Sequence, residues 1–407
     1  MKYELRPYQR EAVSRSLDFF ASSGRGHGLI VLGTGTGKSL VIADTAHKLG
    51  GNVLILQPNQ EILLQNYEKL MSYGVEDAAI YSASLNKKDI GRFTFATIGS
   101  LMSHMSDFDD FRHVIIDEAH EVNPSGGRYA TFINAVPRKV LGLTATPYKL
   151  ASIQRPILDP MGNPVVNLFG DKEMEQGCIL RFLTRMKPRT FERVVYYTQA
   201  GDMLKQGYLA PLTYYDVTPK GFGGIKRNST GMDYDTHDVD AKFNYFDIFS
   251  FTVKVIRRLY DRPDRKHILV FAHDLKQAEF LTRYFHDSAM VSGETPRKQR
   301  GAILDAFKRG EIRVVFNVGV LVVGFDFPAL DTMVFARPTM SLAIWYQAIG
   351  RVVRPFPGKD AWVVDICGTM RTFGRVENLM MGLYDHGKWA VLGWIENQWK
   401  QLTNVFM

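Results

Sequence analysis

The fold is decided by a short stretch near the N-terminus, Leu29-Ile30-Val31-Leu32-Gly33-Thr34-Gly35-Thr36-Gly37-Lys38-Ser39. Four apolar residues predict a buried strand, and the glycines after them predict a tight loop that opens a helix. Backbone N–H groups of such a loop attract phosphate; Lys38 can reach the β- and γ-phosphates, and the Ser39 hydroxyl can ligate Mg²⁺. The strict P-loop pattern has glycine where this chain has Leu32. The intact Gly37-Lys38-Ser39 core still predicts that residues 33–39 bind ATP and Mg²⁺.

Short apolar runs alternate with helix-like stretches around this loop. In the first block we predict strands at Leu29–Leu32, Val53–Leu56, Phe93–Thr97, Val114–Ile116 and Val140–Leu143. A second block has the same pattern, with strands predicted at Ile268–Ala272, Val314–Asn317, Thr332–Ala336 and Ala361–Ile366. Strands that alternate with helices indicate βαβ units and a parallel sheet. The fold class expected is α/β, with two doubly wound domains in tandem and an inserted segment between them.

The predicted boundaries follow from where this pattern stops. We expect domains at residues 1–150 and 211–369, an insertion or linker at 151–210, and a tail at 370–407. The stretch Ala151–Ala200 is rich in proline and has no sustained period, and Gly221–Asp240 is rich in turn residues, which predicts a mobile loop. The tail carries three tryptophans, and we expect a helix packed on the second domain, with the tryptophans at Trp389, Trp394 and Trp399.

Composition limits the class of protein. A chain of 407 residues fits two or three domains, and its formal charge of +8 suits a polyanionic partner, although solubility alone is the simpler explanation of the charge. Two distant cysteines, Cys178 and Cys367, argue against a disulfide framework or a zinc module. The N-terminus lacks the apolar run of a signal peptide, and we find no apolar stretch of about 18 residues. We therefore expect a cytoplasmic protein with no membrane partner.

The second half of a nucleotide site follows in Ile115-Ile116-Asp117-Glu118-Ala119-His120. Apolar residues leading into two acids place the acids at the carboxyl edge of a strand, where ligands of open α/β sheets bind. Asp117 would hold Mg²⁺ and Glu118 would polarise the attacking water. An isolated Asp-Glu pair is usually a solvated loop, but its pairing with the Lys38 loop favours the catalytic interpretation.

Asp117-Glu118-Ala119-His120 resembles the DEAH form of the superfamily 2 helicase signature, and further motifs of that superfamily follow in order. The resemblance implies two RecA-like domains and an adenine-reading element in which Gln9 pairs with the base and Arg6 packs on it. It also implies a motif coupling hydrolysis to domain movement, a motif V whose acid Asp326 lies near the ribose or the opposing arginines, and a motif VI. These three are Leu143–Pro147, Val323–Asp326 and Gln347–Arg354.

Motif VI carries the second half of the predicted catalytic machinery. Arg351 and Arg354 are three residues apart, so on a helix they project from one face. Together with Gln347 they would meet the γ-phosphate held by Lys38 and spread transition-state charge, as arginine fingers do. The alternative is an ordinary basic helix end, which the ordered set of motifs makes less attractive.

The resemblance also marks loops that grip a nucleic-acid strand. Short polar side chains at strand ends suit phosphate contacts without base reading, so we expect sequence-independent, salt-sensitive binding. The candidates are Gln57, Thr97, Ser100, Phe271, Ser292 and Asn317. In the inserted segment, Arg181, Arg185, Lys187 and Arg189 are expected to contact duplex or junction DNA. The nearby aromatics, Phe182, Tyr196 and Tyr197, either stack on bases or belong to a core.

Within superfamily 2 the chain looks most like RadD-like bacterial helicases and, more loosely, phage branch-migrating helicases of the UvsW type. RadD-like proteins extend into a cysteine-rich zinc-binding region, whereas no cysteine follows Cys367 here. We expect a monomeric ATP-dependent helicase or translocase acting on single-stranded, forked or branched DNA, in a bacterial or phage-infected cell, with single-strand-binding or recombination proteins as partners. RNA stays open as a substrate. The alternatives are an ATP-gated clamp or annealing module, and the motor subunit of a restriction system with a separate nuclease.

Overall fold

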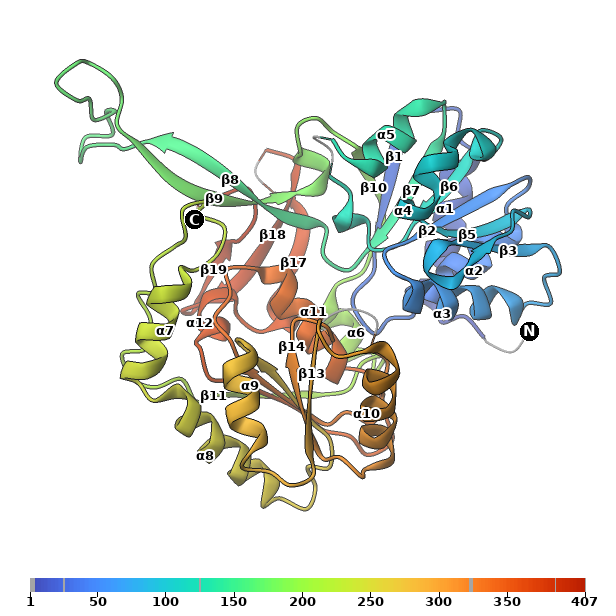
Figure 1. Cartoon of the computed structure of the whole chain (residues 1–407). Coiled ribbons are helices and arrows are strands. Elements are labelled where there is room, and N and C mark those ends of the chain that lie inside the picture. Colours follow the sequence, from blue (N-terminus) through green and yellow to red (C-terminus); the bar gives the residue numbers. More distant parts are fainter. Residues whose placement is uncertain (1–3, 25, 124–125, 322–324, 385, 407) are drawn as a thin grey trace. The chain divides into compact units, whose positions relative to one another are not determined.

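The computed structural model describes residues 4–24, 26–123, 126–321, 325–384 and 386–406 (Figure 1). The chain divides into two compact units. Unit 1 comprises Met1–Lys149 and Phe182–Gln199, and unit 2 comprises Leu150–Arg181 and Ala200–Met407. Each unit is built on a parallel sheet with helices, which confirms the predicted α/β fold class. The segment predicted as one insertion is divided between the two units.

Unit 1 contains an eight-stranded sheet in the order β10-β1-β7-β6-β2-β5-β3-β4. All neighbours pair in parallel except β3 and β4. Its central strands are buried along nearly their whole length, as expected where helices cover both faces of a parallel sheet. The strands are β1 (His27–Val31), β2 (Val53–Gln57), β3 (Ala78–Ser82), β4 (Lys87–Lys88), β5 (Phe93–Thr97), β6 (His113–Ile116), β7 (Lys139–Thr144) and β10 (Phe191–Tyr197).

The helices of unit 1 begin where polar residues follow the strands. Helix α3, for example, begins after Asn59, whose side chain accepts the backbone N–H of Ile62 as an N-cap. The helices are α1 (Pro7–Ala21), α2 (Lys38–Lys48), α3 (Gln60–Met71), α4 (Ile98–Leu101) and α5 (Arg128–Ala135), with 3₁₀ turns η1 (Ala83–Leu85), η2 (Met102–Phe108), η3 (Ala119–Glu121) and η4 (Leu183–Arg185).

Strand β10 was missed from sequence, yet it completes the sheet beside the P-loop strand. It pairs in parallel with β1, from His27 opposite Phe191 to Val31 opposite Tyr197. Phe191 is 2% exposed, and a Cβ added to Gly142 would lie 2.7 Å from its ring. The chain therefore returns from its inserted segment to brace the strand that carries the phosphate loop.

We expect Phe191→Ala to lower the stability of unit 1 by about 3–5 kcal/mol, because the removed ring leaves a cavity against Gly142 that the backbone cannot fill. Urea unfolding of the full chain, followed by circular dichroism, measures the effect. Exposed Arg189→Ala, just before the strand, is the control. An unchanged unfolding midpoint in Phe191→Ala would contradict the packing of β10 in the sheet.

Unit 2 contains a six-stranded, all-parallel sheet in the order β11-β16-β15-β12-β14-β13. Its strands are β11 (Leu212–Asp216), β12 (Ile268–Ala272), β13 (Ser288–Ser292), β14 (Val314–Val318), β15 (Thr332–Ala336) and β16 (Ala361–Asp365). The helices are α6 (Ala200–Lys205), α7 (Thr236–Tyr245), α8 (Ile248–Tyr260), α9 (Leu275–Thr282), α10 (Arg297–Arg309), α11 (Leu342–Val352) and α12 (Thr369–Phe373), with the 3₁₀ turn η5 (Val376–Asn378).

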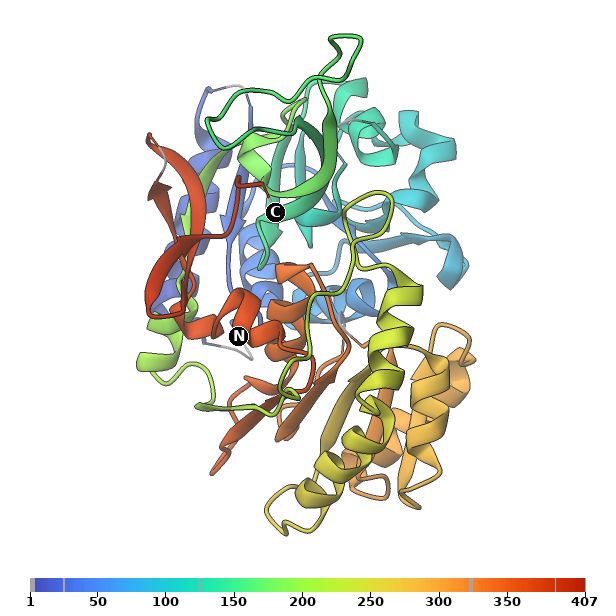
Figure 2. The same cartoon turned by 90° about the vertical axis from the view of Figure 1, so that its left-hand side faces the viewer.

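One correction concerns the segment that leads into α7. The prediction of a mobile loop across Gly221–Asp240 is wrong at its end, because α7 begins at Thr236 after Asp235 caps it by accepting the N–H of Asp238. Helices α7 and α8 follow one another with a single break between them, shown in yellow-green and yellow in Figure 2.

Among the described residues, no helix is both long and apolar enough to cross a membrane.

The tail corrects another prediction. Instead of a helix carrying the three tryptophans, it forms an antiparallel sheet of β17 (Met380–Tyr384), β18 (Lys388–Ile395) and β19 (Gln398–Gln401), red in Figure 2. Glu396 and Asn397 both have positive φ (51° and 59°), which suits a two-residue hairpin turn. This turn sets Trp394 directly opposite Trp399.

Residues 148–182 form a two-stranded arm, β8 (Tyr148–Pro156) and β9 (Met174–Phe182), with its looped tip extended away from the sheet of unit 2 (Figure 1). The base of the arm contacts the tail: Ile179 bridges to Phe406, and the backbone N–H of Asn404 donates to Leu180 O at 2.7 Å. Ser152 Oγ, midway along β8, also donates to Thr230 O at 2.8 Å, so unit 2 holds the arm beyond its base as well.

Candidate nucleotide-binding site and nucleic-acid track

The phosphate loop of unit 1 has the conformation that its glycines predict. Gly35 and Gly37 have φ of 79° and 80°, in the left-handed region that favours glycine, and Gly37 is the N-cap of α2. Lys38 is the first residue of that helix, with Ser39 in its first turn. Thr36 Oγ1 donates to Gly33 O at 2.6 Å and closes the loop. The helix N-terminus, its lysine and a hydroxyl thus form a site suited to phosphate and Mg²⁺.

Helix α1 docks directly on this loop. Thr36 O accepts hydrogen bonds from Tyr8 Oη (2.7 Å) and from Gln9 Nε2 (2.8 Å). Gln9 Oε1 accepts the backbone N–H of Arg6 at 2.9 Å. A Cβ on Gly37 would lie 2.6 Å from Gln9 Nε2, so only glycine permits this approach. Gln9 therefore lies against the phosphate loop with both amide atoms bonded to backbone, and adenine reading by Gln9 and Arg6 stays a prediction.

Asp117 lies at the carboxyl end of β6 and is 4% exposed. Its Oδ2 accepts from Asn66 Nδ2 at 2.9 Å and its Oδ1 accepts the backbone N–H of Glu118 at 2.9 Å. Burial, reinforced by the Glu118 carboxylate and opposed by Lys38, raises the pKa of Asp117 to about 6. A bound cation would stabilise the charged form of this buried carboxylate, and the oxygens of Asp117 and Ser39 fit the ligand preference of Mg²⁺.

Glu118 is the point at which the motifs of unit 1 meet. Its Oε1 lies 3.7 Å from Lys38 Nζ, and its Oε2 lies 3.4 Å from His120 Nδ1. The same ring atom lies 3.0 Å from Thr144 Oγ1, in the Leu143–Pro147 motif. Glu118 has φ 49° and ψ 51°, a strained conformation for a side chain of this size. The four residues link the phosphate loop, the acidic pair and the coupling motif through one carboxylate.

Unit 2 brings the motif VI arginines to motif V. Arg351, in α11, is 6% exposed, and its Nη1 donates to Phe325 O at 2.8 Å. Arg354, two residues beyond the end of α11, forms an ion pair with the carboxylate of Asp326. Burial lowers the pKa of Arg354 to about 10. Gln347 lies in the same helix at 5% exposure. Val323 and Gly324 of motif V lie outside the described residues.

In unit 1 the residues predicted to contact a nucleic-acid strand lie at one edge of the sheet. Gln57 and Thr97 are register partners at the carboxyl ends of β2 and β5. Thr97 Oγ1 lies 2.8 Å from Ser100 Oγ, which also accepts the N–H of Ala83 at 2.9 Å. Gln57 is fully buried, and its amide N and O have no hydrogen-bond partner among the described residues. Such unsatisfied groups are costly, but with no exposed surface the Gln57 side chain cannot contact a nucleic-acid strand in this conformation.

In unit 2 the corresponding candidates divide into two kinds. Asn317 Oδ1 caps the next turn by accepting from Val320 N (3.2 Å) and Leu321 N (2.9 Å), while its Nδ2 has no partner among the described residues. Ser292 Oγ accepts from Glu294 N at 3.2 Å. Phe271, in contrast, is 1% exposed and packs on Phe335. Its ring belongs to the core, so the Phe271 side chain cannot contact a nucleic-acid strand.

The basic cluster predicted in the inserted segment does not form one patch. Arg181 is the next-to-last residue of β9 and belongs to unit 2, whereas Arg185, Lys187 and Arg189 belong to unit 1. Phe182 is fully buried and therefore a core residue. Tyr196 is half-buried in β10, and Tyr197 at its end is 38% exposed. Of the three aromatics, Tyr197 is the most accessible to a base.

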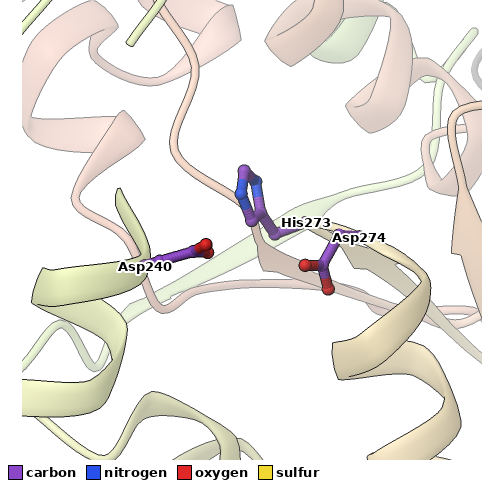
Figure 3. Close-up of side chains that lie close together, drawn as sticks. All are labelled: Asp240, His273 and Asp274. Atoms are coloured by element: carbon purple, nitrogen blue, oxygen red, sulfur yellow. The ribbon is translucent and has the colours of Figure 1, made fainter. Parts of the chain in front are cut away.

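A further cluster in unit 2 has no counterpart in the sequence predictions. Asp240, His273 and Asp274 have ligand atoms within 4.8 Å of one another (Figure 3). A histidine and two carboxylates are suitable ligands for a divalent cation. However, Asp274 Oδ1 already accepts the N–H of Gln277 as the N-cap of α9, and Asp240 is exposed. Capping and solvation account for the cluster without a metal.

Comparison with known sequence families matches residues 2–149 to the res subunit of type III restriction enzymes and residues 252–355 to the helicase conserved C-terminal domain. These two matches support a helicase of superfamily 2. This agrees with the two parallel-sheet units and with the order of the motifs. Assignment to the DEAH, RadD-like or UvsW-like branches is not established by these matches.

Individual relatives are distant and longer. The chain is 22% identical over 387 residues to the putative ATP-dependent helicase IRC3 of Saccharomyces cerevisiae, covering 89% of this chain and 51% of that protein. It is 26% identical to the DNA 3'-5' helicase XPB of Kineococcus radiotolerans, covering 87% and 58%. A putative HsdR subunit of a type I restriction enzyme from Vibrio vulnificus YJ016 shares the fold, with a TM-score of 0.63 at 20% identity, covering 90% and 65%. The chain thus spans little more than half of these sequence relatives.

Proposed function

We propose that the chain is an ATP-dependent DNA helicase or translocase that couples ATP hydrolysis to strand separation or to remodelling of forked and branched DNA. The observation that carries this proposal is the Glu118 carboxylate, 3.7 Å from Lys38 Nζ and next to the buried Asp117. A phosphate-binding lysine, a metal-binding acid and a catalytic base in one site are the parts that nucleotide hydrolysis requires.

The proposed roles in unit 1 follow from this geometry. Backbone N–H groups of residues 33–39 and Lys38 hold the phosphates, and Ser39 and Asp117 hold Mg²⁺, which would neutralise charge on the β- and γ-phosphates. Glu118 orients and polarises the attacking water. His120 lies between Glu118 and Thr144 and so connects Glu118 to the Leu143–Pro147 motif, which offers a route from hydrolysis to conformational change.

Unit 2 would contribute Gln347, Arg351 and Arg354 to the same reaction. The Phe325 carbonyl and the Asp326 carboxylate hold the two arginines in a defined orientation. Closure of the two units on ATP would let the guanidinium groups exchange these partners for the γ-phosphate. Hydrolysis would then require closure, as motion coupled to ATP turnover demands.

We expect Arg354→Ala to lower kcat for ATP by about 10²–10³-fold with a much smaller change in KM, because the charge that Arg354 stabilises develops in the transition state. Arg351→Lys, which keeps the charge of a buried side chain, should give a smaller loss in the same direction. Steady-state ATPase assays measure both, with exposed Arg309→Ala as the control. A rise in KM at unchanged kcat would mean that these arginines bind nucleotide without assisting catalysis.

DNA as the substrate is supported by the formal charge of +8, which suits a polyanionic partner. Branched DNA is supported by the motif resemblance to RadD-like and UvsW-like helicases. The test is ATPase activity and strand displacement on single-stranded, forked and four-way DNA, with an RNA duplex alongside. Stimulation by RNA alone would move the proposal to an RNA substrate.

A second candidate is the motor subunit of a restriction system with a separate nuclease. The match of residues 2–149 to the res subunit and the structural similarity to an HsdR subunit favour it. Translocation without strand separation, measured by triplex displacement, would select this candidate. ATP-dependent binding with neither translocation nor unwinding would select a clamp or annealing module.

A further inference from the structure

Lys359, in the turn between α11 and β16, is a lysine of unit 2 that the proposed reaction does not use. Its Nζ donates to Pro328 O and to Arg354 O, both at 2.8 Å. Pro328 lies two residues after the motif V acid Asp326, and Arg354 ends motif VI. One ammonium group therefore joins the backbone of the motif V loop to the backbone of motif VI.

The backbone of Lys359 is itself held in place. Gly358 has φ 68°, and Lys359 N donates to Phe356 O at 3.1 Å, which closes the turn. The carbonyl of the next residue, Asp360, accepts from Arg265 Nη1 at 2.8 Å. A turn fixed on both sides presents the lysine, so its side chain is suited to hold two loops in place.

Two other contacts join the same motifs, and both are made by arginine side chains. Arg351 Nη1 donates to Phe325 O at 2.8 Å, and Arg354 pairs with the carboxylate of Asp326. In the proposed reaction these guanidinium groups exchange their partners for the γ-phosphate. The contacts of Lys359 are with main-chain carbonyls alone, so nothing in that exchange requires them to break.

The main chain at the end of motif VI is held on two consecutive carbonyls. Val353 O accepts the N–H of Ala210 at 2.8 Å, and Arg354 O accepts from Lys359. Both carbonyls lie close to the end of α11, where carbonyl groups have no partner within the helix. With the backbone held here, the Arg354 guanidinium is redirected by rotation of its side chain and not by displacement of the loop.

Helix capping is the simpler explanation of the bond to Arg354 O, since lysines often bond the last carbonyls of a helix. Capping does not explain the bond to Pro328 O, which belongs to another loop. Burial also lowers the pKa of Lys359 to about 7, with Asp331 opposing the shift and Arg354 adding to it. Among the described residues no carboxylate pairs with Lys359, so its placement costs stability that a solvated cap would not.

We propose that Lys359 is a positioning residue for ATP hydrolysis, which holds motifs V and VI in register so that Arg354 meets the γ-phosphate in a productive orientation. This role rests on the proposed function, because it needs Arg354 to act on ATP. Small displacements of a catalytic group slow a reaction steeply, since the rate depends on alignment of the reacting atoms. Loss of Lys359 should therefore slow turnover and leave nucleotide binding by the phosphate loop unchanged.

Steady-state ATPase assays of Lys359→Met with saturating single-stranded DNA measure the effect on turnover. Methionine keeps an unbranched side chain and removes both hydrogen bonds. We expect kcat to fall about tenfold, with KM for ATP changed by less than about twofold. Lys254→Met, which removes an exposed lysine from α8 of the same unit, is the matched control and should turn over like wild type.

A double-mutant cycle separates positioning from a general effect on stability. If Lys359 acts through Arg354, Lys359→Met should lower kcat about tenfold in wild type and less than about twofold in the Arg354→Ala background. Equal losses in both backgrounds overturn the proposal, because a purely structural lysine lowers the rate whether or not Arg354 is present. Wild-type kcat in Lys359→Met also overturns it and leaves the proposed function standing. The proposed function fails separately, if wild type does not hydrolyse ATP or Lys38→Ala hydrolyses it normally.

Native-state hydrogen exchange without nucleotide or DNA gives a readout that needs no activity. The amides of Leu330 and Val353 report on the two loops, because they donate to Phe327 O and Ile349 O, each at 3.1 Å. In Lys359→Met both should exchange at least about fivefold faster than in wild type, while the amides of β12 stay unchanged. Unchanged exchange at both amides would show that Lys359 holds neither loop and overturn the proposal. Faster exchange throughout the sheet, β12 included, would overturn it too, because the lysine would then serve general stability.

Discussion

Lys38→Ala is expected to lower ATP hydrolysis by at least about a thousandfold while the fold stays intact. Lys38 begins α2 beyond a loop held by its own glycines and by the Thr36–Gly33 bond, and its ion pair is with Glu118. The substitution therefore removes a phosphate contact and no core packing. Phosphate release assays and nucleotide binding by fluorescence measure the two steps separately.

The control for Lys38→Ala is Lys88→Ala, which removes an exposed lysine from β4 of the same unit. The control should hydrolyse ATP at the wild-type rate, and both variants should melt at the wild-type temperature. Hydrolysis by Lys38→Ala within a few-fold of wild type would show that residues 33–39 are not the nucleotide site.

Glu118→Gln is expected to bind ATP with near wild-type affinity and to lose turnover by about 10²–10⁴-fold. Glutamine keeps the size of the side chain, but it cannot polarise water or accept a proton. Because ATP then stays uncleaved, this variant should remain bound to DNA in the presence of ATP for longer than wild type. Single-turnover hydrolysis and DNA retention at a biosensor measure the two effects.

Glu121→Gln is the matched control, because Glu121 also contacts His120, at 3.4 Å, but its side chain is 56% exposed. We expect its turnover to stay close to wild type. Normal turnover in Glu118→Gln would remove Glu118 from its proposed role and leave its strained backbone without a catalytic reason.

The parts of the fold that follow from local pattern were predicted well. Strands Phe93–Thr97, Ile268–Ala272 and Thr332–Ala336 have the bounds expected, because continuous apolar runs ended by polar residues specify buried parallel strands. Strand β10 was missed because it follows a proline-rich segment and is fixed by pairing with β1, far away in the sequence. The prediction of a helical tail was wrong because the turn that pairs β18 with β19 sets Trp394 opposite Trp399, a pairing that no helical spacing indicates.

Some residues of the candidate site were likewise predictable from local sequence, and others were not. Residues of the phosphate loop and the acidic pair are contiguous, so their chemistry is visible in the sequence. The Asn66–Asp117 bond joins residues 51 positions apart, and no local pattern indicates it. The left-handed backbone of Glu118 and the full burial of Phe271 likewise depend on tertiary packing. The role proposed for Lys359 was hidden because a lysine after a Pro-Gly turn resembles any loop residue at the surface.

The central claim is that this chain hydrolyses ATP at the Lys38–Glu118 site in response to DNA. The most direct test is steady-state ATPase activity of wild type and Lys38→Ala with no nucleic acid and with single-stranded, forked and four-way DNA. We predict low basal activity, stimulation of wild type by at least about tenfold with DNA, and no activity in Lys38→Ala under any condition. Wild-type hydrolysis that DNA leaves unchanged, or hydrolysis that survives in Lys38→Ala, would contradict the account.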